Sequence, residues 1–243
     1  MRPPLPPPAR GSLIFSLRAL VVLAFALVMM RLRIATVPAS EASDRIVRAW
    51  AARVLRWSGC HVTVHGAEHL TGSCALFVAN HASALDSVVL MASLAAPFRF
   101  VVNHAAATRP LLGAAISKAG HLVVDRRSAA SRAACARLMI AALRHGTSLV
   151  VYPEGTRAVG AMLPFQAVPF RVAQAAGRQV VPIAIEGTGQ ILPRRFWLLS
   201  RVPVTVTVLP PIESGPGMTA MALRDEAASA IAARLNRSLP PAT

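Results

Sequence analysis

The chain has 243 residues, enough for one sizeable domain with a full hydrophobic core. Hydrophobic residues make up 54% of it and the mean hydropathy is +0.51, which is high for a freely soluble protein. The net charge of +16 predicts an anionic partner, either nucleic acid or an anionic membrane surface. Arginines are spread along the chain and aromatic residues make up only 5%, which leaves few stacking platforms for bases. We therefore expect a membrane surface and no nucleic acid.

The N-terminal segment indicates membrane attachment. Residues 1–11 are rich in proline and are expected to be disordered. Residues 13–30 are apolar apart from Ser16 and Arg18 and are nearly long enough to span a bilayer. A signal peptide is the alternative, because Val37-Pro38-Ala39 resembles a cleavage site, but arginines directly after the apolar stretch argue against it. We expect an anchor that spans the inner membrane or lies in it, with the domain that follows it on the cytoplasmic side.

The next segment, residues 44–57, has the pattern of a basic amphipathic helix, with apolar residues at helical spacing and arginines between them. Such a helix could lie on anionic headgroups or pack on its own domain, and the sequence leaves both alternatives open. The predicted organisation is therefore a disordered N-terminus at 1–11, an anchor and amphipathic helix at 12–58, and one domain at 59–240.

From residue 60 onward, short apolar segments alternate with helical ones, which predicts an α/β domain. We expect a mixed, largely parallel sheet of about seven strands with helices on both faces. The predicted strands are 61–65, 75–79, 99–103, 121–124, 148–152, 180–185 and 202–208. The predicted helices are 84–95, 128–145, 168–176 and 220–236.

The cysteines do not predict a disulfide framework, because three is an odd number and no Cys-x-x-Cys occurs. One alternative is a metal site, formed by Cys60, His61, His65 and His69. However, residues 62–64 indicate a strand and Gly66 interrupts the segment, so helical spacing of these ligands is doubtful. We expect no metal.

The most informative motif is the interval from His81 to Asp86, which follows the buried strand predicted at 75–79. Positions five apart differ by about 140° around an α-helix, so the two side chains cannot share one face of a continuous helix. They can meet if His81 lies on the loop and Ser83 caps a helix whose first turn contains Asp86. The carboxylate would then hold the imidazole Nδ1–H and leave the other ring nitrogen free as a base. An ordinary capping box with an uninvolved histidine is the alternative.

Two more predicted strands end in polar groups. After the strand at 148–152, Gly155 permits close approach of a ligand, Thr156 can donate a hydrogen bond and Arg157 can bind a phosphate through two N–H groups. The strand at 121–124 leads to Arg126, another phosphate or carboxylate partner. The alternative for both is a solvated turn, with Glu154 and Arg157 paired in solvent. Strand ends of this kind can converge on one edge of a sheet.

In this order and at these separations, the motifs resemble those of the glycerolipid acyltransferases, and most closely the 1-acyl-sn-glycerol-3-phosphate acyltransferases. That family's Asn-His-x4-Asp motif is matched by Asn80, His81 and Asp86, and its Pro-Glu-Gly-Thr-Arg motif by residues 153–157. Its Gly-x-Ile-x-Val-x-Arg-type block is matched loosely at 120–126. An apolar block with a proline is matched at 180–184, and the resemblance covers about residues 60–210.

The chain departs from this family at two places. The family commonly shows lysine after the strand at 99–103, where this chain has Asn103. It commonly shows Phe-Lys-x-Gly downstream of its Pro-Glu-Gly-Thr-Arg motif, where this chain reads Phe165-Gln166-Ala167-Val168. These differences bear on the acyl-donor contacts and the substrate identity more than on the reaction type.

The resemblance implies transfer of an acyl chain from acyl-CoA or acyl-carrier protein to the sn-2 hydroxyl of lysophosphatidic acid, giving phosphatidic acid, with no metal or other cofactor. His81 would deprotonate the hydroxyl and Asp86 would orient the imidazole, so no protein nucleophile is needed. The residues expected at the substrate are Asn80, Arg126, Glu154, Gly155, Thr156 and Arg157. The alternatives are an acyltransferase for another lyso-lipid, such as lyso-ornithine lipid, and a non-catalytic membrane-anchored lipid-binding protein.

Overall fold

The structure is a computed structural model, which describes residues 13–36, 41–70, 74–94, 97–158, 160–192, 201–215 and 217–236. The predicted disordered segment 1–11 and the cleavage-like residues 37–39 lie outside these ranges.

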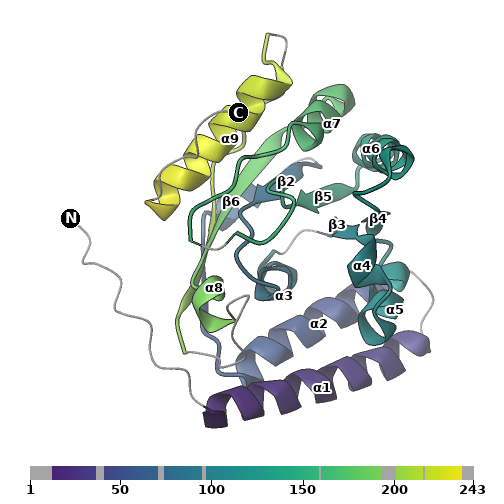
Figure 1. Ribbon diagram of the computed structural model, residues 1–243, viewed down its shortest axis with the longest axis vertical. Coiled ribbons are helices and arrows are strands. Elements are labelled where there is room, and N and C mark those ends of the chain that lie inside the picture. The colour runs from purple at the N-terminus through teal and green to yellow at the C-terminus, as the bar shows by residue number, and fades with distance from the viewer. Residues whose placement is uncertain are drawn as a thin grey trace.

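A seven-stranded sheet forms the centre of the domain, in the order β1-β7-β6-β2-β5-β3-β4 (Figure 1). Its strands are β1 (Val62–His65), β2 (Leu76–Ala79), β3 (Phe98–Asn103), β4 (Leu122–Val124), β5 (Ser148–Val151), β6 (Val180–Glu186) and β7 (Val204–Val208). All neighbours are parallel except β6 and β7, which are antiparallel. The predicted mixed, largely parallel sheet is confirmed, and each predicted strand lies within two residues of an observed one.

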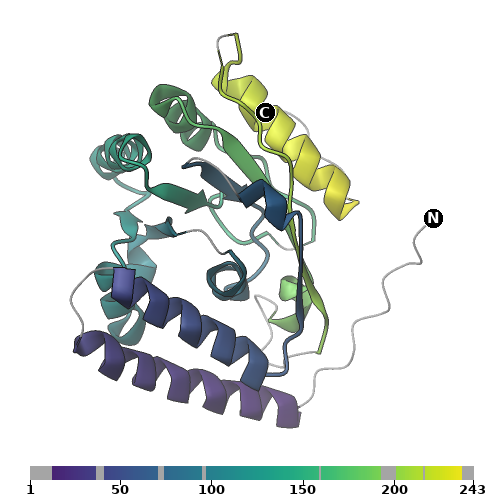
Figure 2. The ribbon, with the colours of Figure 1, turned by 180° about the vertical axis from the view of Figure 1, so that it is seen from behind.

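The helices are α1 (Leu13–Ala35), α2 (Glu41–Trp57), α3 (Leu85–Ser93), α4 (His104–Ala107), α5 (Pro110–Lys118), α6 (Ala129–Arg144), α7 (Val168–Ala176), α8 (Thr188–Ile191) and α9 (Ala220–Leu235), with a short 3₁₀ helix, η1 (Ala67–Leu70). The helices α6, α7 and α9 cover one face of the sheet, and α2 and α3 lie against the other (Figures 1 and 2). The predicted helices on both faces are confirmed.

Alternation along the strands explains the two hydrophobic cores. In β2, Leu76 and Val78 belong to the core under α6, α7 and α9, whereas Phe77 and Ala79 belong to the core under α2 and α3. All four residues of β2 are buried, as are all four of β5, because helices cover both faces of a parallel sheet. The loops that follow β2 and β5 therefore start from strands that are buried on both faces.

The segment between β3 and β4 contains two helices, α4 and α5, for which the sequence analysis predicted no helix. Asn103 ends β3 and caps α4, because its side-chain Oδ1 accepts a hydrogen bond from the Ala105 N–H at 3.0 Å. Pro110 opens α5, a position where its missing N–H costs nothing. A Cβ on Gly113 would lie 2.0 Å from the carbonyl oxygen of Ala107, so glycine lets the two helices pack closely. Asn103, Pro110 and Gly113 are residue types that usually interrupt helices, but here the first two begin helices and Gly113 lets them pack together.

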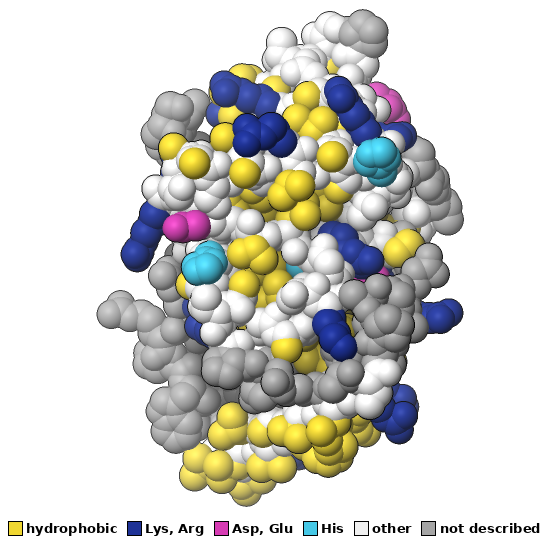
Figure 3. All heavy atoms as spheres, turned by 90° about the vertical axis from the view of Figure 1, so that its right-hand side faces the viewer, with side chains coloured by type: hydrophobic (Ala, Val, Ile, Leu, Met, Phe, Trp, Pro, Cys, Tyr) yellow, Lys and Arg dark blue, Asp and Glu magenta, His cyan; other side chains and the backbone are white. Residues whose placement is uncertain are grey.

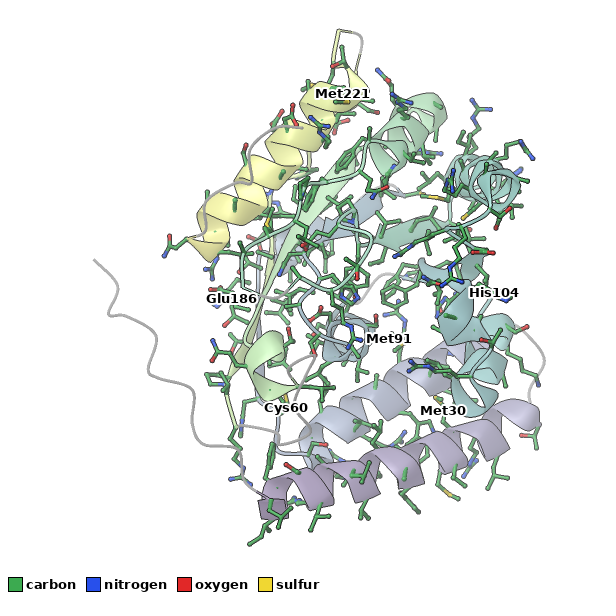
Figure 4. All side chains as sticks on the ribbon, in the orientation of Figure 1. Met30, Cys60, Met91, His104, Glu186 and Met221 are labelled. Atoms are coloured by element: carbon green, nitrogen blue, oxygen red, sulfur yellow. The ribbon has the colours of Figure 1, made fainter. Side chains whose placement is uncertain are left out.

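The N-terminal helices α1 and α2 lie side by side along the base of the domain (Figures 1 and 2). Helix α2 contacts α3 and buries Val47, Ala51 and Leu55, so the alternative in which it packs on its own domain is confirmed. Met30 of α1, labelled in Figure 4, shares a small core with Val47 and with Ala115 of α5. Residues 13–30 are long and apolar enough to cross a membrane, with a mean hydropathy of 2.5.

A polar cluster joins α2 to the sheet. The Asp44 carboxylate lies 2.8 Å from Arg99 of β3 and 4.0 Å from Arg48, and the Arg48 guanidinium lies 4.6 Å from the centre of the Phe98 ring. His121, just before β4, accepts a hydrogen bond at Nδ1 from the Phe100 N–H at 3.3 Å. Burial lowers the pKa of His121 to about 4; Asp44 acts in the opposite direction, and Arg99 and Arg48 lower it further.

This pKa predicts acid sensitivity of the fold. His121 is neutral in the folded protein down to about pH 4 but takes up a proton near pH 6.5 when unfolded, so the stability it contributes is lost as the pH falls from 6.5 to 4. The loss attributable to this residue is about 3 kcal/mol at pH 4. Urea unfolding in mild detergent gives the free energy of unfolding at pH 7 and pH 4. The decrease between these pH values should be smaller for His121→Gln than for the unaltered protein, and the Gln amide oxygen can still accept the hydrogen bond from Phe100. An equal pH dependence in the two proteins would contradict this explanation.

Candidate active site

Three loops meet at one edge of the sheet because the strands that carry them run parallel. The strands β2 and β5 are neighbours, and β3 separates β5 from β4. The His81 carbonyl accepts a hydrogen bond from the Ala158 N–H at 2.7 Å, which joins the loops after β2 and β5. The Arg126 Nη1 lies 3.9 Å from the position that a Cβ on Gly155 would occupy. The loop after β4 therefore reaches the same place, as the sequence predicted.

The His81 and Asp86 side chains are in contact. The Nδ1 of His81 lies 2.8 Å from Oδ2 of Asp86, and the same oxygen accepts hydrogen bonds from the N–H groups of Ala82, at 2.8 Å, and Ser83, at 2.9 Å. Asp86 is fully buried in the first turn of α3, whereas the His81 side chain remains 19% exposed. Because an ionised carboxylate can only accept, Nδ1 donates to it, and in the neutral imidazole Nε2 then carries the lone pair.

The predicted capping differs in detail. Helix α3 begins at Leu85, and the capping position is Ala84, whose side chain cannot bond. The Ser83 hydroxyl accepts from the Leu85 N–H at 3.2 Å and donates to the Leu192 carbonyl at 3.0 Å. The prediction of Ser83 as the N-cap is therefore wrong by one residue. Asp86 reaches back to the loop as predicted.

Glu154 is buried and connects three parts of the site. Its Oε1 accepts a hydrogen bond from the His81 N–H at 2.7 Å, and its Oε2 accepts one from the Leu163 N–H at 2.8 Å. Only 4% of the residue is exposed, so the alternative of a glutamate in solvent is wrong. The carboxylate therefore fixes the backbone at both His81 and Leu163.

Asn80 is buried in the same way, with 2% of its surface exposed. Its amide donates to the Ile185 carbonyl at 2.9 Å and accepts from the Ile185 N–H at 2.8 Å. These two bonds tie the end of β2 to β6. The Asn80 side chain is thus directed into the sheet, and it holds the residue next to His81 in place.

The Pro-Glu-Gly-Thr-Arg motif surrounds Gly155, which has a φ of +74°, a conformation that favours glycine. A Cβ at this position would meet Gln166 Nε2 at 3.4 Å and Arg126 Nη1 at 3.9 Å. Burial lowers the pKa of the Arg126 guanidinium, which nevertheless remains charged. Thr156 is exposed and Arg157 is half-buried. Gln166, one of the family departures, thus lies beside the same open backbone as Arg126.

The described residues hold no group of three or more His, Cys, Asp or Glu side chains that could bind a metal ion. Of the ligands considered in the sequence, His65 ends strand β1 and His69 lies in η1.

A family model described as Acyltransferase matches residues 61–186, just over half of the chain. The matched range contains His81, Asp86, Arg126 and the loop at 153–157. The chain belongs to the acyltransferase family. The resemblance drawn from the motifs is thereby confirmed.

Curated relatives include a chloroplastic 1-acyl-sn-glycerol-3-phosphate acyltransferase of Arabidopsis thaliana, 33% identical over 77% of this chain and 52% of the relative. An enzyme of the same name from Chlamydomonas reinhardtii is 33% identical over 74% of this chain and 53% of its own length. One from Borreliella burgdorferi is 27% identical over 64% of this chain and 63% of its own length. The chain spans about half the length of the first two.

A solved structure has the same fold. The 1-acyl-sn-glycerophosphate acyltransferase of Thermotoga maritima superimposes with a TM-score of 0.77, covering 94% of this chain and 98% of that one at 20% identity. The predicted acyltransferase-like architecture is therefore confirmed, including N-terminal helices placed before the α/β domain.

The buried position of Glu154 predicts a structural cost on its removal. Glu154→Ala leaves the N–H groups of His81 and Leu163 without an acceptor, and should lower the free energy of unfolding by about 3 kcal/mol. Glu213→Ala is the matched control, because Glu213 is exposed, and should change stability by less than about 0.5 kcal/mol. Denaturant unfolding of both variants measures the difference. Equal stabilities would show that Glu154 does not hold these loops.

Proposed function

We propose that the chain transfers an acyl group from an acyl thioester to the sn-2 hydroxyl of lysophosphatidic acid, giving phosphatidic acid. The observation that carries this proposal is the His81–Asp86 contact of 2.8 Å, placed at the sheet edge where Arg126 and the loop 153–157 also lie. The relatives' shared name supports the same acceptor. Either acyl-CoA or acyl-carrier protein fits as donor.

In the proposed mechanism, Nε2 of His81 takes the proton of the acceptor hydroxyl as its oxygen attacks the thioester carbonyl. Asp86 holds the Nδ1–H and stabilises the imidazolium that forms. Collapse of the tetrahedral intermediate forms the new ester and breaks the carbon–sulfur bond. The leaving thiolate then recovers the proton from the imidazolium. The acceptor oxygen is itself the nucleophile, so the protein supplies a base and positioning.

The acceptor's phosphate requires cationic donors near the base. Arg126 and Arg157 supply guanidinium groups that can bind phosphate oxygens in pairs, and Thr156 supplies an exposed hydroxyl. Gly155 keeps the backbone open beside Arg126. We assign Asn80 and Glu154 a positioning role, since their polar atoms bond to backbone groups of Ile185, His81 and Leu163.

The two departures from the family weaken the cationic character of this region. Asn103 uses its side chain to cap α4, and Gln166 is a neutral amide. A site with fewer cations favours a smaller negative charge on the acceptor, which keeps another lyso-lipid as the second candidate acceptor. Rates with lysophosphatidic acid, a lysophospholipid with a zwitterionic headgroup and a lyso-ornithine lipid would separate these candidates.

The surface of α1 supports membrane attachment. One side of the helix buries Phe15, Ala19, Ala26 and Met30 against the protein. The rest of its circumference presents the exposed apolar residues Leu13, Ile14, Leu17, Leu20, Val21, Leu23, Phe25, Val28 and Leu32, of which Phe25 also contacts Trp50 and Trp57 of α2. Figure 3 shows hydrophobic side chains gathered at the end of the molecule formed by this helix. Large exposed apolar patches mark protein or membrane interaction sites.

We place α1 in the plane of the membrane surface. It packs along α2, which carries the exposed arginines Arg45, Arg53 and Arg56, and a bilayer-spanning α1 would bring those charges into the hydrocarbon. Anionic headgroups match these arginines. We propose the cytoplasmic face of the inner membrane, where acyl thioesters are formed.

The base assignment is tested by substitution. His81→Ala should lower thiol release from an acyl thioester in the presence of lysophosphatidic acid by about 10²- to 10⁴-fold, since the base is lost. Asp86→Asn should cost a comparable factor, because the imidazole loses its acceptor. His145→Ala, a change at an exposed histidine at the end of α6, should retain the full rate. Undiminished turnover in folded His81→Ala would end the assignment.

The acceptor assignment is tested by the arginines. Arg126→Ala and Arg157→Ala should each raise the KM for lysophosphatidic acid about 10- to 100-fold, the loss of a charge-assisted hydrogen bond. The KM for the thioester should change little. Arg137→Ala is the matched control, because this arginine is exposed on α6. If the acceptor dependence of a variant matches that of the unaltered protein, its arginine does not bind the phosphate.

A further inference from the structure

The imidazole of His81 lies flat against an aromatic ring. Its centre is 4.1 Å from the centre of the Tyr152 ring, and the two planes differ by 15°. Tyr152 directly follows β5 and precedes the loop at 153–157. From the sequence, Tyr152 is predicted only to be the last residue of a strand.

Further aromatic rings continue from Tyr152 into the protein. The Phe100 ring lies 6.2 Å from that of Tyr152, at an interplanar angle of 18°. Phe98 and His121 contact Phe100 edge-on, at 5.1 Å and 5.4 Å. Since Phe98 and Phe100 are buried in the core beneath α2 and α3, Tyr152 rests on fixed neighbours.

The hydroxyl of Tyr152 is held as well. Its oxygen lies 3.1 Å from the Ser87 hydroxyl, on the helix that carries Asp86. Burial raises the pKa of Tyr152 well above its usual value, and the Asp86 carboxylate raises it further. The phenol therefore stays protonated and able to donate. Tyr152 thus contacts His81 through its ring and, through its hydroxyl, contacts α3, the helix that carries Asp86.

The bond from Nδ1 to Asp86 leaves a degree of freedom. The terminal torsion of a histidine side chain is broad, so one hydrogen bond fixes a point on the ring better than the direction of Nε2. A stacked ring 4.1 Å away removes the rotations that would tilt the imidazole. Its electron-rich face also favours the cation that forms when Nε2 takes a proton.

We propose that Tyr152 is a positioning residue for His81: its ring sets the plane of the imidazole so that Nε2 points at the acceptor hydroxyl, and its face stabilises the imidazolium. The inference rests on the proposed function, because it specifies how the base of that reaction is held. The ring carries this role and is held by its packing on Phe100, to which the hydroxyl contact with Ser87 adds little.

Three substitutions separate ring from hydroxyl. Tyr152→Leu removes the stack, Tyr152→Phe keeps the ring without its hydroxyl, and Ser87→Ala removes the hydroxyl's partner. Tyr152→Leu should lower kcat about 10- to 100-fold, the cost of a displaced reacting group, while the KM values for acceptor and thioester stay within about twofold. Tyr152→Phe and Ser87→Ala should keep kcat within about threefold of the unaltered protein. Tyr152→Met, which fills the space without a ring, replaces Tyr152→Leu if that variant does not fold.

A double substitution tests whether Tyr152 acts through His81. In a His81→Ala background, Tyr152→Leu should leave the residual rate unchanged, because the group it orients is already gone. A purely structural tyrosine would lower the residual rate or raise both KM values. A full kcat in Tyr152→Leu, or an equal loss in both backgrounds, would overturn the proposal.

A measurement independent of turnover keeps this inference apart from the proposed function. Diethyl pyrocarbonate modification of His81, followed by mass spectrometry, should be severalfold faster in Tyr152→Leu than in the unaltered protein, with Tyr152→Phe unchanged. If no lyso-lipid is acylated but the modification rates differ in this way, the proposed reaction fails and the positioning of the imidazole stands. Equal modification rates would overturn the positioning even in an active enzyme.

Discussion

A single carboxylate oxygen organises this site. Oδ2 of Asp86 accepts three hydrogen bonds, from the imidazole of His81 and from the backbone N–H groups of Ala82 and Ser83. Among the residues that the structure describes, the other oxygen, Oδ1, has no hydrogen-bond partner. A fully buried charge is costly unless it is paired, and here three donors and the start of α3 offset that cost. The same bonds that make the carboxylate tolerable therefore fix the turn that displays the imidazole.

The loop around His81 is held from both sides, which is unusual for a connecting segment. Asp86 binds it from the helix that follows, and the buried Glu154 binds its backbone from the loop after β5. Asn80 adds two bonds to β6 just before it. Strand β2 pairs in parallel with β5 on one side and β6 on the other, so the ends of these strands keep a fixed spacing. The loops that follow the strands are therefore also held at fixed positions. The position of His81 thus depends on the sheet as much as on its own turn.

The sequence predicted what depends on local pattern. Apolar runs located the seven strands, helical periodicity located α6, α7 and α9, and the spacing of His81 and Asp86 predicted their contact. It did not predict contacts between residues distant in the chain: the partner of Asn80 lies 105 residues away and that of the His81 N–H lies 73 away. The stack of Tyr152 on His81 depends on the register of β2 beside β5, which no local pattern encodes. Helices α4 and α5 were missed because Asn103, Pro110 and Gly113 resemble loop residues yet act as cap, first residue and packing site.

Helix α3 links the N-terminal helices to the His81–Asp86 pair. Its Val89 and Leu90 are buried in the core that also holds Leu55 of α2, while its first turn carries Asp86. Helix α2 in turn packs on α1 and is tied to β3 through Asp44 and Arg99. A lysophospholipid lying in the bilayer presents its free hydroxyl near the headgroup level, so a base that acts on it must stand at a fixed height above the membrane. If α1 lies in the membrane surface, as we propose, the packing of α1, α2 and α3 sets the height of His81 above the membrane. A change in the contact between α2 and α3 would then alter the access of the lipid to His81 without changing any residue of the site.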